Sequence, residues 1–172
     1  PLQGTQIYYA LFPDSENEDK RIYAAMAASL EDGIVASLDA LIETGLEENT
    51  LVIFLSNNGA GVADYAINAP LRLGKHTLFE GGVRVPFTIK WPKQISKGKV
   101  YHNPVSSLDI LHTAVAAAGG RIPNEPTIEG VDLLPYLDGS SNDNPHNALF
   151  WRNGANWAIR EEDWKLIYAG ER

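Results

Sequence analysis

Apolar positions recur at helical spacing in the first quarter of the chain. From about Glu18 they lie three or four residues apart, near one face of a helix, at Ile22, Met26, Leu30, Ile34, Leu38, Leu41 and Ile42. Gly45 follows them, at a position where glycine commonly ends a helix. The pattern predicts one long amphipathic helix between Glu18 and Gly45.

Residues 50–55 form a short apolar run without alternation. Strands that are buried on both faces have this pattern, as in sheets covered by helices. A long helix followed by such a strand is half of a β-α-β unit, so the sequence predicts an α/β fold. Residues 56–82 then lose periodicity and contain five glycines, which predicts a long loop of the kind that is usually functional.

Two further elements are predicted in the middle of the chain. Residues 83–91 suit a strand, at a sheet edge or at a strand start because Pro86 interrupts them. The sequence Ser-Ser-Leu-Asp at residues 106–109 resembles a capping box. It predicts a helix that ends at the glycine pair 119–120.

The end of the chain predicts strands with aromatic side chains against a small core. Residues 148–151 and 157–168 have this character. The acidic pair Glu161-Glu162 precedes Asp163 in an expected hairpin turn. A solvated position is far more typical of such a pair than acid–base catalysis.

Composition excludes several classes of function. The net charge of -8 argues against a nucleic-acid or anionic-membrane surface, and it means that a local cation must attract any anionic substrate. The absence of cysteine removes disulfides, thiolate zinc sites and cysteine nucleophiles from this chain. No run of about 18 apolar residues exists, so no membrane span is expected.

Two asparagines follow the apolar run of residues 50–55. Asn57 and Asn58 fall beyond the carboxyl end of the expected strand, where α/β sheets bind ligands. Their carboxamide oxygens suit a hard cation such as calcium. A plain turn is the alternative interpretation of Asn57-Asn58-Gly59, because asparagine and glycine tolerate left-handed conformations, and spacing alone favours the turn.

A glycine-framed lysine is the second candidate. Lys75 follows Gly74, and its ammonium could meet the oxygens of sulfate or phosphate as a point charge. A solvated loop lysine is the ordinary alternative. His76 is the histidine nearest this segment, although a loop histidine is more often incidental. The sequence has no serine-hydrolase elbow, phosphate-binding Gly-x-x-x-x-Gly-Lys or zinc-protease motif.

Several ordered blocks resemble the formylglycine-dependent sulfatases, which belong to the alkaline phosphatase superfamily. The most specific block is Gly-Lys-His-Thr-Leu-Phe-Glu-Gly-Gly at residues 74–82. The resemblance covers nearly the whole chain from about residue 20 onward. The blocks lie at residues 23–26, 51–59, 69–86, 91–92, 107–113, 130–135 and 164–167.

The resemblance implies a fold and an activity. Residues 1–140 would be the C-terminal part of an alkaline-phosphatase-like mixed sheet flanked by helices, within the catalytic domain. Residues 141–172 would begin a small antiparallel subdomain. The complete protein would hydrolyse a sulfate ester of a small molecule or a glycan, using calcium and a formylglycine nucleophile. Family members are commonly periplasmic or secreted, so such a location is expected.

The family's site residues map onto few positions of this chain. The resemblance places Asn57 and Asn58 at a calcium-binding Asp-Asn pair, and Lys75 at a catalytic lysine that contacts the sulfate. It places His76 beside this lysine as a substrate-binding residue. Glu80 and Arg84 match positions that we interpret as structural, as an ion pair shaping the loop.

Two departures from the family pattern matter. Asn57 stands where the family has aspartate, which removes a negative charge and should weaken or abolish calcium binding. The nucleophile motif Cys/Ser-x-Pro-x-Arg is absent, and the family carries it upstream of the segment that this chain matches. The chain alone is therefore expected to be inactive.

Other interpretations stay open from the sequence. A non-catalytic binding or interaction module would keep the fold, and Asn57 favours it. A phosphoryl-transferring relative would be told apart by its substrate preference. In either case a truncated α/β domain should self-associate through the surfaces that its missing half would cover.

Overall fold

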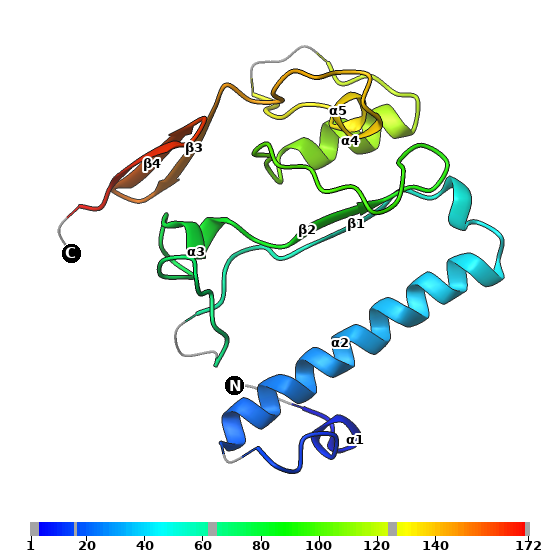
Figure 1. Cartoon of the computed structure of the whole chain (residues 1–172), viewed down its shortest axis with the longest axis vertical. Helices are drawn as coiled ribbons and strands as arrows, with labels where there is room; N and C mark the ends of the chain where they lie inside the picture. The colour runs from blue at the N-terminus through cyan, green and yellow to red at the C-terminus, as the bar shows by residue number, and fades with distance from the viewer. Residues whose placement is uncertain (1–3, 16, 62–64, 124–126, 171–172) are drawn as a thin grey trace. The chain divides into compact units, whose positions relative to one another are not determined.

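The computed structural model describes residues 4–15, 17–61, 65–123 and 127–170 (Figure 1). The chain forms two compact units. The first consists of Pro1–Glu47 and Leu55–Pro86, and the second of Glu48–Phe54 and Phe87–Arg172. Helices and short strands both occur, so the chain has the mixed α/β character that the sequence predicts.

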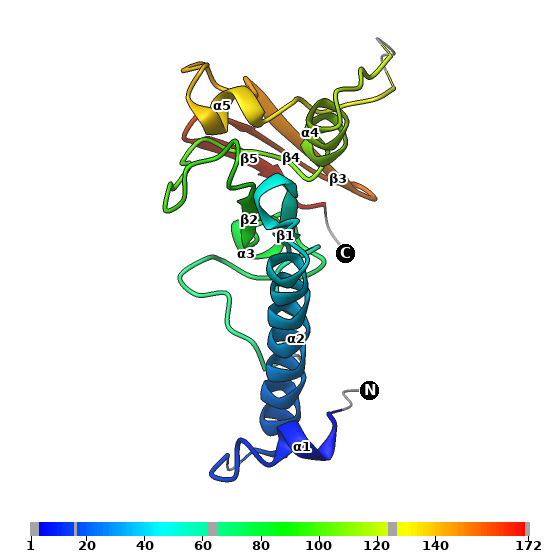
Figure 2. The ribbon, with the colours of Figure 1, turned by 90° about the vertical axis from the view of Figure 1, so that its right-hand side faces the viewer.

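The first unit contains the predicted long helix. It is α2, Glu18–Glu43, and Figure 2 shows it as one unbroken helix. The side chain of Asn17 caps it by accepting a hydrogen bond from Lys20 N at 2.9 Å. Gly45 follows its end with a φ of 70°, the left-handed conformation that glycine adopts without strain. The predicted helix and its glycine stop are confirmed.

A short helix, α1 (Gln6–Tyr9), packs on the start of α2. Arg21 of α2 donates from Nε to Tyr9 O at 3.1 Å, and its guanidinium lies 3.7 Å from the centre of the Tyr9 ring. The rest of the apolar face of α2 is only partly covered: Leu30 is 59% exposed and Ile42 is 53% exposed, whereas Ile34, Leu38 and Leu41 are half-buried. The amphipathic pattern is therefore present without a full covering layer in the described part of the chain.

The segment after residue 56 carries a short helix that the sequence did not predict. This helix, α3, spans Glu80–Val83, closed by hydrogen bonds from Val83 N to Phe79 O at 3.2 Å and from Arg84 N to Glu80 O at 2.8 Å. The predicted strand over residues 83–91 is accordingly too long at its start. The observed strand, β2, covers Phe87–Lys90.

Strand β1, Val52–Leu55, pairs with β2 in a two-stranded sheet, after a 3-10 helix η1 at Glu47–Asn49. The prediction that this strand is buried on both faces is wrong for this chain, because Phe54 is 42% exposed and the other three residues are half-buried. A sheet needs helices or further strands packed on each side to bury both faces, and this two-stranded sheet is not fully covered by the described residues.

The predicted capping box is present at the start of α4, Asp109–Ala117. Ser106 N donates to Asp109 Oδ2 at 2.7 Å, which is one arm of the motif, while Ser106 Oγ accepts from Leu108 N at 3.2 Å instead of from Asp109 N. Gly119 has a φ of 72° just after the helix, as its predicted role as a stop requires.

Helix α5, Leu134–Asp138, is fastened to α4 by buried polar groups. Thr113 Oγ1 donates to Asp109 O at 2.8 Å and accepts from Leu133 N at 3.0 Å. Asp109 Oδ1 accepts from Val131 N at 3.0 Å. Asp109 and Thr113 are fully buried, so the polar pairs hold the chain just before α5 against α4.

The end of the second unit is an antiparallel sheet of order β3-β4-β5. The predicted strands are confirmed, and residues 157–168 supply two of the three, joined by a turn at Glu162-Asp163. The strands are β3 (Ala148–Asn153), β4 (Asn156–Glu161) and β5 (Trp164–Tyr168). No helix among the described residues is both long enough and apolar enough to cross a membrane.

Candidate functional site

The Asn-Asn-Gly turn and the glycine–lysine segment form one hydrogen-bonded unit. Gly59 N donates to Gly82 O at 2.9 Å, and Lys75 N donates to Ala60 O at 3.1 Å. Both bonds lie within the first unit. Main-chain pairing thus brings together two segments that the sequence separates by 15 residues or more, and these segments carry all four predicted site residues.

Glycine is required at this junction because backbone approaches backbone. A Cβ on Gly59 would overlap the carbonyl oxygen of Gly81, and a Cβ on Gly74 would overlap that of Ala60. Gly59 and Gly74 are both buried. Their role is close approach of two chain segments rather than a special φ value.

Asn68 completes the junction, and the sequence offered no signal for it. Its Oδ1 accepts from Ala60 N at 2.9 Å, and its Nδ2 donates to Ala60 O at 2.8 Å. The carboxamide therefore satisfies both main-chain groups of one residue, as a neighbouring strand would. An asparagine in a polar loop is too common to stand out in a single sequence.

Tyr65 links the same loop to the first turn of α2. Its hydroxyl donates to Asp19 Oδ2 at 2.7 Å. This hydrogen bond, helped by the negative charge of Asp19, raises the pKa of Tyr65 above its ordinary value. Both residues belong to the first unit, so the loop is held at the helix as well as at Ala60.

The two asparagines differ in their surroundings. Asn58 is half-buried, and its Nδ2 donates to Gly59 O at 3.1 Å while its own carbonyl accepts from Ser56 Oγ at 2.8 Å. Asn57 is exposed. The backbone bends at Asn57 and Asn58, but neither residue nor Gly59 has a positive φ, so the left-handed conformation behind the turn interpretation is not adopted here.

Lys75 and His76 are both exposed next to this junction. His76 has a φ of 71° and Leu73 a φ of 58°, so two non-glycine residues adopt the left-handed conformation on either side of Gly74-Lys75. Such backbone is uncommon and gathers at ligand-binding sites. The predicted ion pair between Glu80 and Arg84 stays a prediction, while their main chains are hydrogen-bonded.

The residues present can supply only part of a calcium site. Calcium takes six to eight oxygen ligands, usually with several carboxylates. The described residues contain no group of three or more His, Cys, Asp or Glu that could hold a metal ion. Asn57 and Asn58 offer two neutral carboxamide oxygens, so they could supply two of the ligands. The negatively charged ligands would have to come from other residues.

Comparison with known proteins identifies the family of this chain. The chain belongs to the sulfatase family: residues 4–120 match the family described as Sulfatase. Residues 73–169 match the family described as N-sulphoglucosamine sulphohydrolase, C-terminal. The predicted family is confirmed.

Individual relatives match between 77% and 97% of this chain. Steryl-sulfatase of Mus musculus is 33% identical over 97% of the chain, and N-acetylgalactosamine-6-sulfatase of Mus musculus is 36% identical over 77% of it. The crystal structure of Ps i-CgsB is 35% identical, with a TM-score of 0.88 over 97% of the chain. The predicted alkaline-phosphatase-like α/β fold is thereby confirmed.

The chain is much shorter than these relatives. It spans 29% of the steryl-sulfatase, 26% of the N-acetylgalactosamine-6-sulfatase and 38% of the Ps i-CgsB chain.

Proposed function

We propose that this chain is the C-terminal part of a sulfatase that hydrolyses sulfate esters. The observation that carries the proposal is the main-chain junction of Gly59 and Ala60 with Lys75 and Gly82. It joins the segment that carries the exposed Lys75 to the segment that carries the carboxamide pair, and these residues could together present positive charge and oxygen ligands to one anionic group. Family membership supports the same reaction class.

Lys75 is the residue that we assign to the sulfate. Negative charge on the sulfate oxygens is stabilised by cations already in place. The chain carries a net charge of -8, so a sulfated substrate depends on local cations rather than on the overall field. His76 follows it in sequence, and we assign it to substrate binding at the same place.

Asn57 and Asn58 would hold one side of a calcium ion through their carboxamide oxygens. The bound ion would supply positive charge to the sulfate oxygens. Because Asn57 adds no negative charge, we expect weaker binding than a carboxylate at this position would give. The remaining ligands and the formylglycine nucleophile belong to sequence outside this chain.

A sulfated glycan or a sulfated small molecule is the proposed substrate class. Ps i-CgsB, which is 33% identical to this chain, has been solved in complex with k-i-k-neocarrahexaose. Steryl-sulfatase, a relative of similar identity, is named for a sterol instead. We also propose a periplasmic or secreted location, on the family resemblance.

The first test is the activity of the 172-residue chain by itself. We expect no sulfate release from an aryl sulfate, because the chain contains no cysteine and no Ser-x-Pro-x-Arg to act as nucleophile. Sulfate release that is lost in Lys75→Ala would contradict this expectation. The longer protein to which we assign the chain should be active on the same substrate.

In that longer protein, Lys75→Ala should lower kcat by about 100-fold to 1,000-fold, the usual effect of removing one group that stabilises transition-state charge. Lys97→Ala is the matched control, since Lys97 is an exposed lysine of the second unit. Equal activity of the Lys75 variant and the control would remove the lysine from the mechanism.

Asn57 favours a second candidate, a non-catalytic module that binds sulfated ligands without hydrolysing them. A longer protein that binds an aryl sulfate but never releases sulfate would support it. Faster release of phosphate than of sulfate would instead indicate a phosphoryl-transferring relative.

A further inference from the structure

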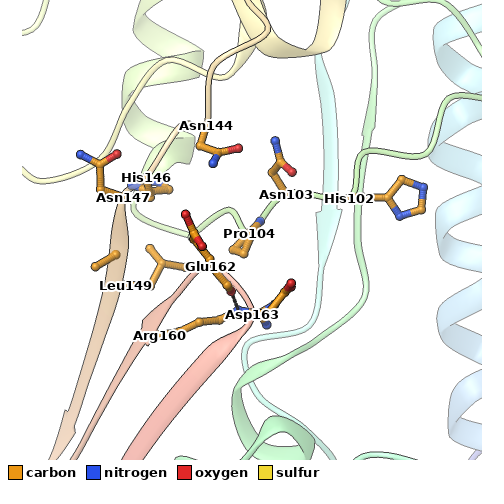
Figure 3. A pocket seen from close by; sticks show the side chains of 11 residues that line it. His102, Asn103, Pro104, Asn144, His146, Asn147, Leu149, Arg160, Glu162 and Asp163 are labelled. Carbon is orange, nitrogen blue, oxygen red and sulfur yellow. Dashed lines mark hydrogen bonds between the residues drawn. The ribbon is translucent and has the colours of Figure 1, made fainter.

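The second unit contains a polar pocket that the sulfate chemistry does not use. Its volume is about 280 Å³, and it lies between residues 102–104, residues 144–149 and the turn between β4 and β5. Figure 3 shows the side chains of Asn144, Asn147 and Glu162 around this space, whereas the ring of His102 is turned away from them.

One wall of the pocket is anchored to a buried charge. His146 Nε2 lies 2.9 Å from Asp109 Oδ2, and Asp109 is fully buried at the start of α4. The same carboxylate receives the main-chain N–H groups of Ser106 and Val131. Three segments of the second unit are therefore fixed at one side chain, and the wall that bears Asn144 and Asn147 has a rigid base.

The opposite wall is the turn that joins β4 to β5. Glu162 has a φ of 51°, a conformation that is uncommon for glutamate. Arg160 Nε donates to Glu162 O at 3.1 Å and so holds the turn. A residue kept in unfavourable backbone beside a pocket is a reason to look for a ligand there.

The chemistry of the lining selects among ligands. Arg160 disfavours a metal cation in the pocket, and the carboxylates of Glu162 and Asp163 disfavour an anion such as sulfate. Carboxamides both donate and accept hydrogen bonds, and Asn144 and Asn147 supply two of them. The pocket thus combines a positively charged donor, negatively charged acceptors and neutral carboxamides. This combination suits a neutral molecule that carries several hydroxyl groups.

We propose that this pocket binds a neutral, unsulfated sugar residue. Drug-sized ligand pockets begin at about 300 Å³. At about 280 Å³ this pocket is smaller and suits a single sugar ring. The carboxylates accept from sugar hydroxyls, Arg160 donates to them, and the carboxamides do both. This binding does not depend on sulfate hydrolysis, so the two proposals can fail separately.

The test is saturation-transfer NMR on the 172-residue chain with D-galactose and D-galactose 6-sulfate as separate probes, and isothermal titration calorimetry of the same chain with calcium. We expect signal transfer to D-galactose, with binding about tenfold weaker in Asn147→Ala and in Glu162→Gly, since each loses one hydrogen-bonding group. Glycine suits the left-handed φ at position 162, so Glu162→Gly removes the carboxylate without backbone strain.

Glu161→Gln is the matched control, because Glu161 is an exposed neighbour that does not line the pocket, and it should bind as the unmodified chain does. Far-ultraviolet circular dichroism checks that each variant is folded. Absence of transfer to D-galactose would overturn the proposal, as would equal binding by all variants. Preference for the sulfated sugar, or calcium binding lost in Glu162→Gly, would assign the pocket to an ion instead.

Discussion

At the scale of single residues, the candidate site depends on backbone contact more than on side-chain chemistry. Positions 59 and 74 require glycine because a carbonyl oxygen lies where a Cβ would be. Position 68 requires a carboxamide because its side chain bonds both main-chain groups of Ala60. The side chains that we propose for the site, Asn57 and Lys75, are exposed next to these backbone contacts. Changes at these exposed positions should therefore alter function with little loss of stability.

Asn57→Asp should strengthen calcium binding by the longer protein. A carboxylate keeps the oxygen ligand of the carboxamide and adds a negative charge, and ligand charge is a main determinant of calcium affinity. We expect a decrease in Kd of about tenfold or more, measured by isothermal titration calorimetry. Asn57→Ala, which removes the oxygen, should weaken binding. Identical affinities for the three proteins would show that residue 57 is not a ligand.

At the scale of elements, the sequence predicts those features that depend on interactions between residues close together in the chain. The glycine stop at Gly45, the capping box at residues 106–109 and the aromatic strands after residue 147 depend on near neighbours, and the sequence predicted them. The sequence does not reveal the Asp109–His146 contact, because it joins residues 37 positions apart. For the same reason it did not indicate Asn68 or the pocket.

The Asp109 side chain joins three segments of the second unit, through Ser106, Val131 and His146. Asp109→Ala would leave the N–H groups of Ser106 and Val131 without their acceptor and His146 without its partner. Removing one member of a buried charged network costs about 3 kcal/mol or more in the free energy of unfolding.

Chemical denaturation followed by tryptophan fluorescence measures this change, because all four tryptophans lie within the second unit. Asp143→Ala is the control, since Asp143 is an exposed aspartate of the same unit, and it should change stability by about 0.5 kcal/mol or less. A similarly small change in Asp109→Ala would mean that the network does not hold the unit together.

At the scale of the whole molecule, the chain exposes more apolar surface than a self-sufficient protein usually does. One face of the antiparallel sheet carries Phe150, 72% exposed, opposite Ile159 and Leu166 in register. Trp164 on the same face is 84% exposed. A contiguous face of this kind recruits a partner, and we propose that copies of the chain cover it for one another.

Light scattering on the purified chain should accordingly report dimers or larger species, with a mass that falls toward the monomer in Phe150→Ser/Trp164→Ser. Ile7→Ser, which alters an exposed apolar residue of the first unit, should leave the mass unchanged. A monodisperse monomer for the unmodified chain would contradict the proposal.

The Asn68 contact with Ala60 has a consequence for how this sequence can vary. Aspartate at position 68 could accept but not donate, and alanine could do neither, so only a carboxamide meets both main-chain groups. Positions 59, 68 and 74 should thus tolerate substitution as poorly as core positions, although they lie in a loop. In this chain, a position tolerates mutation poorly where backbone segments lie close together or where a side chain bonds main-chain groups. A prediction based only on whether a position lies in a loop would overestimate the tolerance of these three positions.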